Sequence, residues 1–261
     1  MNQDYKSNYF KEFIEEIKYK NRNPKNTEVL KLLDNKSTNP FRTIEAGTIL
    51  YRSRIIEDES KINQSNGFFG YSAKESFVPP IEKTNDLRAN YKYIPYLYCA
   101  GDPYTSLVEV RPRLGAHVSV ARIKVNNDML LLDFTRQSIP NDMSKEKVDL
   151  FDDISSLFSK PIAIDDEILD YIPTQFIAEY AKNLGYDGIA FRSSLTPELK
   201  DQDTVLHKEL DRYNIVIFNY ENCEPIKSNV FEIIFNHIES KQIDSDTDKI
   251  DMHIPLLDMY Y

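Results

Sequence analysis

The chain has 261 residues, of which 41% are hydrophobic, and carries a formal net charge of −10. A chain of this size buries roughly 70–75% of its unfolded surface, so it needs no metal or disulfide to hold a core together. The acidic balance, with an isoelectric point near 5.0, argues against a general nucleic-acid binder, which requires a basic face to neutralise phosphates.

No stretch approaches eighteen apolar residues, and the first residues lack a basic segment followed by an apolar one. The two cysteines, Cys99 and Cys223, form no CxxC pair, which favours reduced thiols. We therefore expect a cytoplasmic protein with no signal peptide, no membrane segment and no direct contact with nucleic acid.

The first elements in chain order are helical and then extended. Residues 5–20 have apolar side chains at helical spacing and predict an amphipathic helix that packs on the main domain, followed by a short helix at 28–33. The segment TILYRSR at 48–54 alternates residue types as a half-buried strand does. This strand places Arg52 and Arg54 on the same face.

A long irregular segment at 57–87 follows, of the kind that often serves as a lid. The run IPYLYCA predicts a strand at 94–100, with Tyr96 and Tyr98 on the same side. We expect Thr105 to cap a short helix that carries Glu109 and that Pro112 ends.

The second half of the chain alternates strands and helices. We expect strands at 117–125 and 129–134, a polar insertion with a helix before about 167, and strands at 187–194 and 213–219. Thr174 is expected to cap a helix that ends at Gly185 in the left-handed conformation.

Several common kinds of site are absent from the sequence. The seven glycines form neither GxGxxG nor GxxxxGK, no GxSxG occurs, and the four histidines form no HExxH. The histidine pattern argues against a zinc site, and the missing GxSxG argues against a serine hydrolase. Because the glycine motifs that bind phosphate through the backbone are missing, side chains must hold any anion. A guanidinium matches phosphate oxygens as a planar fork. The candidates are Arg52, Arg54, Arg88, Arg111 and Arg113; the alternative is that these arginines are solvated charges paired with surplus carboxylates.

The tyrosines also have two interpretations. Tyr96 and Tyr98 could line one wall of a pocket, and a turn followed by a helix would bring Glu109 beside that wall. Alternatively, they form the edge of a tyrosine-rich core, which is the more common role on sequence grounds.

Five blocks together resemble the RES domain, a family named for its conserved Arg, Glu and Ser and related in fold to ADP-ribosyltransferases. They are YRSR at 51–54, RAN with IPYLYCA at 88–100, TSLVEVRP at 105–112, TQFIAEYAKNLGYDGIAFRSS at 174–194 and NIVIF at 214–218. The resemblance implies an α+β fold with an ADP-ribosyltransferase-like mixed β-sheet core and flanking helices. It implies a catalytic domain at 46–225, an N-terminal helical extension at 1–45 and a C-terminal extension at 226–261.

The resemblance also implies an activity. Members of the RES-domain family consume NAD+ by cleaving the nicotinamide–ribose bond, either as glycohydrolases or as phosphorylases that use inorganic phosphate. Many are toxins that an Xre-type helix-turn-helix antitoxin inhibits. NAD+ is then a substrate, and no metal is needed. Two alternatives stay open: an ADP-ribosyltransferase that modifies a macromolecule, and an inactive module that binds the antitoxin. The sequence also leaves open the acceptor, water or phosphate, and whether the chain forms a homodimer.

The motifs of the family assign roles to positions of this chain. Arg52, Arg88 and Glu109 take the catalytic positions, whereas Tyr98, Tyr96, Ser193 and Arg54 are expected to contact NAD+, with Ser194 less favoured than Ser193. Two departures from the expected patterns stand out. Tyr93 replaces the usual glycine near IPYLY, and Leu107 stands where arginine-directed ADP-ribosyltransferases place a second glutamate.

Overall fold

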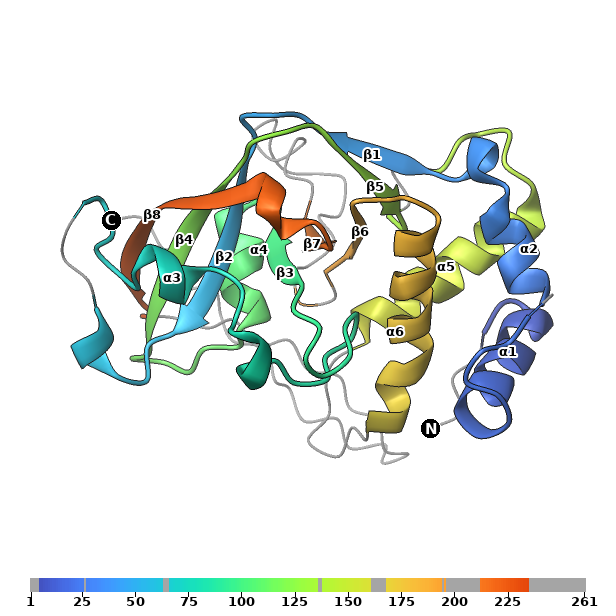
Figure 1. The fold of residues 1–261 in the computed structure, drawn as a ribbon, viewed down its shortest axis with the longest axis horizontal. Helices are drawn as coiled ribbons and strands as arrows, with labels where there is room; N and C mark the ends of the chain where they lie inside the picture. The colour runs from blue at the N-terminus through green and yellow to red at the C-terminus, as the bar shows by residue number, and fades with distance from the viewer. Residues whose placement is uncertain are drawn as a thin grey trace, which may run out of the picture.

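The computed structural model describes residues 5–25, 27–62, 66–135, 138–160, 168–193, 195 and 212–234. Across these residues eight strands form one mixed sheet in the order β1-β5-β6-β7-β3-β2-β4-β8 (Figure 1). Neighbouring strands are antiparallel except β5 and β6, which are parallel. The strands are β1 Phe41–Ile44, β2 Ile49–Ile55, β3 Leu97–Ala100, β4 His117–Val125, β5 Met129–Asp133, β6 Gly188–Arg192, β7 Tyr213–Ile217 and β8 Cys223–Glu232.

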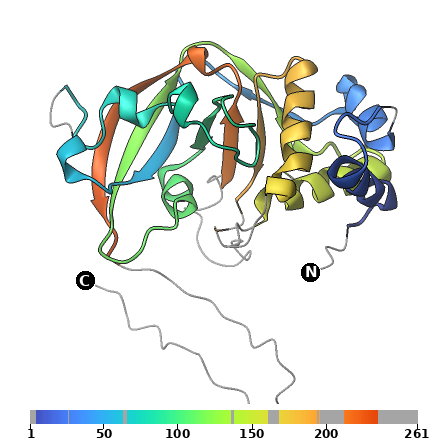
Figure 2. The same cartoon turned by 60° about the horizontal axis from the view of Figure 1, so that its bottom comes forward.

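Four helices, among them the three longest of the described residues, gather at one end of the molecule, beside β5 and β6 (Figures 1 and 2). This group consists of α1 Asn8–Tyr19, α2 Glu28–Asp34, α5 Lys145–Ser159 and α6 Ile168–Asn183. The short helix α4, Pro103–Glu109, connects β3 to β4 and packs against β2. The remaining short elements are α3 Ala73–Ser76, η1 Lys36–Thr38, η2 Glu59–Lys61, η3 Ile81–Lys83 and η5 Tyr220–Asn222.

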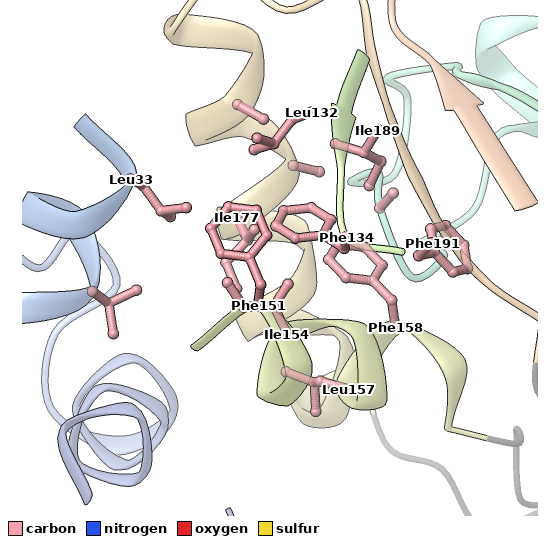
Figure 3. Packing of buried hydrophobic residues seen from close by; sticks show 14 of the residues in the cluster. Leu33, Leu132, Phe134, Phe151, Ile154, Leu157, Phe158, Ile177, Ile189 and Phe191 are labelled. Atoms are coloured by element: carbon pink, nitrogen blue, oxygen red, sulfur yellow. The ribbon is translucent and has the colours of Figure 1, made fainter. Parts of the chain in front are cut away.

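The main core lies between these helices and one face of the sheet (Figure 3). Its centre is aromatic: the Phe134 ring lies 5.2 Å from that of Phe151 and 5.8 Å from that of Phe158. Phe13 and Ile17 bring α1 into the same cluster, which confirms that the N-terminal helix packs on the main domain. Each fully buried side chain of this size contributes about 1.5–3 kcal/mol to folding.

The sheet divides between β2 and β3. These strands share one registered pair, Tyr51 with Ala100. In contrast, β2 pairs with β4 along its whole length, and β3 pairs with β7 along its whole length. The two strands therefore diverge on one side of this pair, and the segment 79–90 borders the space between them.

The predicted α+β class, with a mixed sheet and flanking helices, is confirmed. Two strands, β1 and β8, were not predicted, and β8 begins before residue 226, where we expected an extension to start. The prediction that Thr174 caps a helix is wrong: α6 begins at Ile168 and contains Pro173, and the Thr174 hydroxyl donates to the carbonyl of Tyr171. Gly185, with φ +86°, ends the segment in the left-handed conformation as predicted.

Candidate active site

A pocket of about 500 Å³ lies where β2 and β3 diverge. The sheet register explains which side chains border it. Tyr51 pairs with Ala100, Ala100 with Asn214, and Asn214 with Phe191, so these four residues form one row across four strands and face the same side. All four line the pocket.

Helix α4 closes this side of the pocket and carries Glu109 as its last residue. Asp102 caps the helix, because its side chain accepts hydrogen bonds from the Thr105 backbone N–H at 2.9 Å and from the Thr105 hydroxyl at 2.5 Å. Pro103 occupies the first turn, where its missing N–H costs nothing. Our prediction that Thr105 is the cap is wrong by one turn, and the helix ends before Pro112.

The Glu109 carboxylate is held by two donors. Its Oε1 accepts hydrogen bonds from the Ser193 hydroxyl at 2.5 Å and from Asn214 Nδ2 at 2.8 Å. Within the described residues Oε2 has no protein donor, and Glu109 borders the pocket. One oxygen therefore fixes the orientation of the carboxylate, and the other is left for a ligand.

Arg52 crosses the divide in the sheet. Its Nη1 donates to the carbonyl of Tyr98 at 3.0 Å, whereas its buried Nε has no partner in the described structure. Burial lowers the pKa of the Arg52 guanidinium from its ordinary value. A buried charged donor without an acceptor is costly. Because Arg52 lines the pocket, an anionic or polar ligand there would supply the missing acceptor.

Tyr98 lies close to both predicted arginines. Its hydroxyl donates to Asn90 Oδ1 at 2.7 Å and accepts from the Ala89 backbone N–H at 3.1 Å. Burial raises the pKa of Tyr98, while the positive charges of Arg88 and Arg52 act in the opposite direction. The hydroxyl therefore stays protonated and fixed, and the tyrosine ring borders the pocket. Arg88 donates to the carbonyl of Leu157 at 3.0 Å.

The pocket is positively charged although the chain is acidic. Among its described lining residues the one carboxylate is Glu109, and five residues are cationic: Arg52, Lys83, Arg88, Arg111 and Lys160. Lys83 and Lys160 had no sequence signal beyond their charge. The arrangement suits an anionic ligand with one positively charged centre beside Glu109.

Two predicted contacts occupy other places. Arg54 does not border this pocket; its Nη1 lies 3.4 Å from Glu75 Oε2, and its guanidinium lies 5.0 Å from the centre of the Tyr71 ring. Tyr96 borders the pocket, but it is 2% exposed, and its hydroxyl donates to Glu179. The core interpretation therefore describes Tyr96 well, whereas Tyr98 is the residue of the pair whose surroundings suit a ligand wall.

Ser193 lies behind Glu109. It is 1% exposed and is not among the pocket-lining residues, so it holds the carboxylate. Ser194 lies outside the described residues. Asn214, the second donor to Glu109, was missed from the sequence. The available signal was a polar residue at the start of the apolar strand NIVIF, in a block that carries the family resemblance.

No group of three potential metal ligands occurs among the described residues. His117 lies 3.2 Å from Glu59 at the surface, and the other three histidines lie outside the described ranges. None of the described helices is long and apolar enough to cross a bilayer. Burial raises the pKa of the Cys99 thiol to about 12, so this pocket-lining cysteine is neutral.

A divided mixed sheet, a pocket lined mainly by cationic side chains and a carboxylate fixed by two donors make up the candidate site. The chain belongs to the RES-domain family, whose profile matches residues 61–230. No curated protein matches the chain in sequence. Among solved structures, the M. tuberculosis MbcT–MbcA toxin–antitoxin complex is a distant likeness, with 14% identity and a TM-score of 0.42 over 78% of this chain and 93% of that one.

Proposed function

We propose that this protein is an NAD+-degrading enzyme that cleaves the nicotinamide–ribose bond, with water or inorganic phosphate as the acceptor. The observation that carries the proposal is the Glu109 carboxylate, which Ser193 and Asn214 hold at the wall of a pocket rich in arginine and lysine. Membership of the RES-domain family supports it, since the family consumes NAD+.

Loss of nicotinamide leaves an oxocarbenium-like ribose, and a nearby carboxylate stabilises such a centre. Glu109 Oε2 is the oxygen for this role, because its Oε1 is already occupied. Nicotinamide departs from a cationic ring as a neutral molecule, so its departure needs no strong general acid. The absence of a histidine from the described pocket lining is therefore compatible with the chemistry.

Arg52 and Arg88 are the proposed partners of the NAD+ diphosphate. The unpartnered Nε of Arg52 would gain an acceptor, and Tyr98, which lines the same pocket, would offer its ring to nicotinamide. A charge-assisted hydrogen bond contributes about 1.5–3 kcal/mol, and an aromatic contact about 0.5–1.5 kcal/mol.

By the same family relationship, we propose that the enzyme is a cytoplasmic toxin and that an Xre-type helix-turn-helix antitoxin covers the pocket mouth. Leu107 disfavours the alternative of an arginine-directed ADP-ribosyltransferase, because it packs with Val118 and Val120 instead of supplying a second carboxylate. An inactive binding module would not require Glu109 to be held by two donors.

Glu109→Gln tests the proposed function. The amide keeps the shape of the side chain but removes the charge, so nicotinamide release from NAD+ should fall by about 10²-fold or more. Release is measured with purified protein in buffers with and without phosphate. The matched control is Glu224→Gln, which neutralises a surface glutamate that lies 3.4 Å from Lys124.

The cellular consequence can be measured with the same variants. Wild-type expression should stop growth and lower cellular NAD+, whereas Glu109→Gln should do neither. Co-expression of the neighbouring reading frame, the proposed source of the antitoxin, should restore both growth and NAD+. Unchanged nicotinamide release in Glu109→Gln would contradict the role of the carboxylate. Normal growth with wild-type protein and no antitoxin would contradict the role as a toxin.

A further inference from the structure

Two serine hydroxyls meet in the wall of the pocket. Ser53 on β2 and Ser106 on α4 have their Oγ atoms 2.8 Å apart. They are 7% and 5% exposed, and both line the pocket. Among the described residues, neither hydroxyl has another hydrogen-bond partner.

The hydrogen-bonding capacity of this pair is incomplete. Each hydroxyl has one proton and two lone pairs, and one proton is used in the bond between them. The second proton has no acceptor in the described part of the protein. Buried hydroxyls normally satisfy such a donor. Because both residues border the pocket, a small molecule that contains oxygen can complete the pair.

The position of the pair connects it to the reaction. Ser106 precedes Glu109 by three residues in the same helix, and residues at this spacing share one face. Ser53 lies two residues after Tyr51 on β2, so both side chains face the same side of the sheet. Tyr51 belongs to the row of paired residues that also contains Asn214. The serine pair therefore lies on the same side of the sheet as Glu109 and its donor Asn214.

We propose that the Ser53–Ser106 pair binds the acceptor, a small oxygen nucleophile such as water or inorganic phosphate. This inference rests on the proposed cleavage of NAD+. As the bond between ribose C1′ and the nicotinamide nitrogen breaks, its electron pair leaves with nicotinamide, and an acceptor oxygen forms the new bond to C1′. Attacking water passes its proton to the Glu109 carboxylate, whereas hydrogen phosphate in its dianionic form attacks without losing a proton.

The test measures the fate of C1′ separately from nicotinamide release. Ser53→Ala, Ser106→Ala and the double variant are incubated with NAD+ and a fixed concentration of methanol, with and without phosphate. ADP-ribose, its 1″-phosphate and the methyl riboside are then quantified. The double variant is informative because replacing both partners with apolar groups leaves no unsatisfied hydroxyl, so it retains the fold.

Ser159→Ala is the matched control. Ser159 also lines the pocket, but its hydroxyl donates to the carbonyl of Arg192 at 2.5 Å. It contacts neither Glu109 nor the Ser53–Ser106 pair through that hydrogen bond. We expect the Ser53 and Ser106 variants to keep the KM for NAD+ within about twofold. The ratio of methyl riboside to ADP-ribose, or the phosphate concentration needed for half-maximal 1″-phosphate formation, should rise roughly fivefold, the effect of one lost hydrogen bond.

Three outcomes overturn the inference. Unchanged product ratios and phosphate requirement in the double variant would show that the pair does not hold the acceptor. A raised KM for NAD+ with unchanged ratios would assign the pair to the substrate instead. Absence of nicotinamide release from the wild-type protein would overturn the proposed function and the acceptor site together, which separates this failure from the first two.

Discussion

The two parts of the sheet that meet at Tyr51 and Ala100 differ in how they are supported. On one side, β3, β7, β6 and β5 lie against a large aromatic core formed with α1, α5 and α6. On the α4 side, β2, β4 and β8 have a small cluster centred on Val118, Val120 and Ile233, whereas the opposite face of these strands belongs to a second core that both parts of the sheet share. The heavily packed part holds Tyr98, Asn214 and Ser193, whereas Arg52 belongs to the lightly packed part. The pocket therefore takes Tyr98 and Asn214 from one part and Arg52 from the other.

The largest effect should come from the packed part. Phe134→Ala removes a ring that is 1% exposed and contacts both Phe151 and Phe158, so it should lower the free energy of unfolding by about 3–5 kcal/mol. Val118→Ala, in the small cluster of the other part, should cost about 2 kcal/mol because it removes fewer carbons. Urea unfolding measures both. Equal losses would contradict the expectation that the Phe134 ring contributes more than the Val118 side chain.

Asn214→Asp should have the next largest effect. The substitution replaces the donor at 2.8 Å from Glu109 Oε1 with a second carboxylate, and like charges at this distance repel. We expect nicotinamide release to fall by about 10- to 100-fold. Asn214→Ala, which removes the donor without adding charge, is the control and should lose less. If the two variants have equal turnover, the charge beside Glu109 is not what matters.

Arg52→Lys and Arg54→Lys compare two arginines on the same face of one strand. Lysine keeps the charge but loses the planar fork, so Arg52→Lys should raise the KM for NAD+ about tenfold. Arg54 pairs with Glu75 outside the pocket, so Arg54→Lys should leave the KM near the wild-type value. Steady-state kinetics decide this, and an equal rise in both variants would argue for a general charge effect.

The smallest effect concerns Tyr93, which lies between the segment 79–90 and β3. Tyr93 has φ +70°, a conformation that glycine adopts readily and tyrosine does not. Its side chain is 54% exposed, so little burial is lost on truncation. Tyr93→Gly should raise the free energy of unfolding by about 0.5–1 kcal/mol. Tyr93→Ala keeps the strain and should bring no gain in thermal unfolding, and a gain as large as that of glycine would point to the ring instead.

The sequence predicted the parts of this fold that depend on local pattern. The apolar spacing of α1, the extended segments of β2 and β4 and the terminating Gly185 are all local signals, and the structure has each element where it was predicted. The prediction for Thr174 failed because α6 begins at Ile168 and continues through Pro173. β1 and β8 were not predicted because their apolar residues do not mark one buried face: Phe41 and Phe231, for example, are exposed.

The site was predictable only in part, for a related reason. The family motifs identified Glu109, Arg52, Arg88 and Tyr98, all of which line one pocket. They could not show that Ser193 is turned toward Glu109 or that Asn214 joins it, because these contacts depend on how the ends of β6 and β7 meet α4 in space. Arg54 shares a strand face with Arg52, but the sheet divides beside Arg52, and Arg54 lies farther along β2, next to Glu75.

The cationic lining of the pocket has a consequence for the end of each catalytic cycle. NAD+ carries a positive nicotinamide ring that partly offsets its diphosphate, but the ADP-ribose product has lost that charge. If the proposed function holds, the arginines and lysines of the pocket therefore attract the product more strongly than the substrate. Turnover would then be set by how quickly the product escapes, and departure of a bound molecule is a common limit on enzyme rates. An enzyme of this kind would slow as its own product accumulates, even before an antitoxin reaches it.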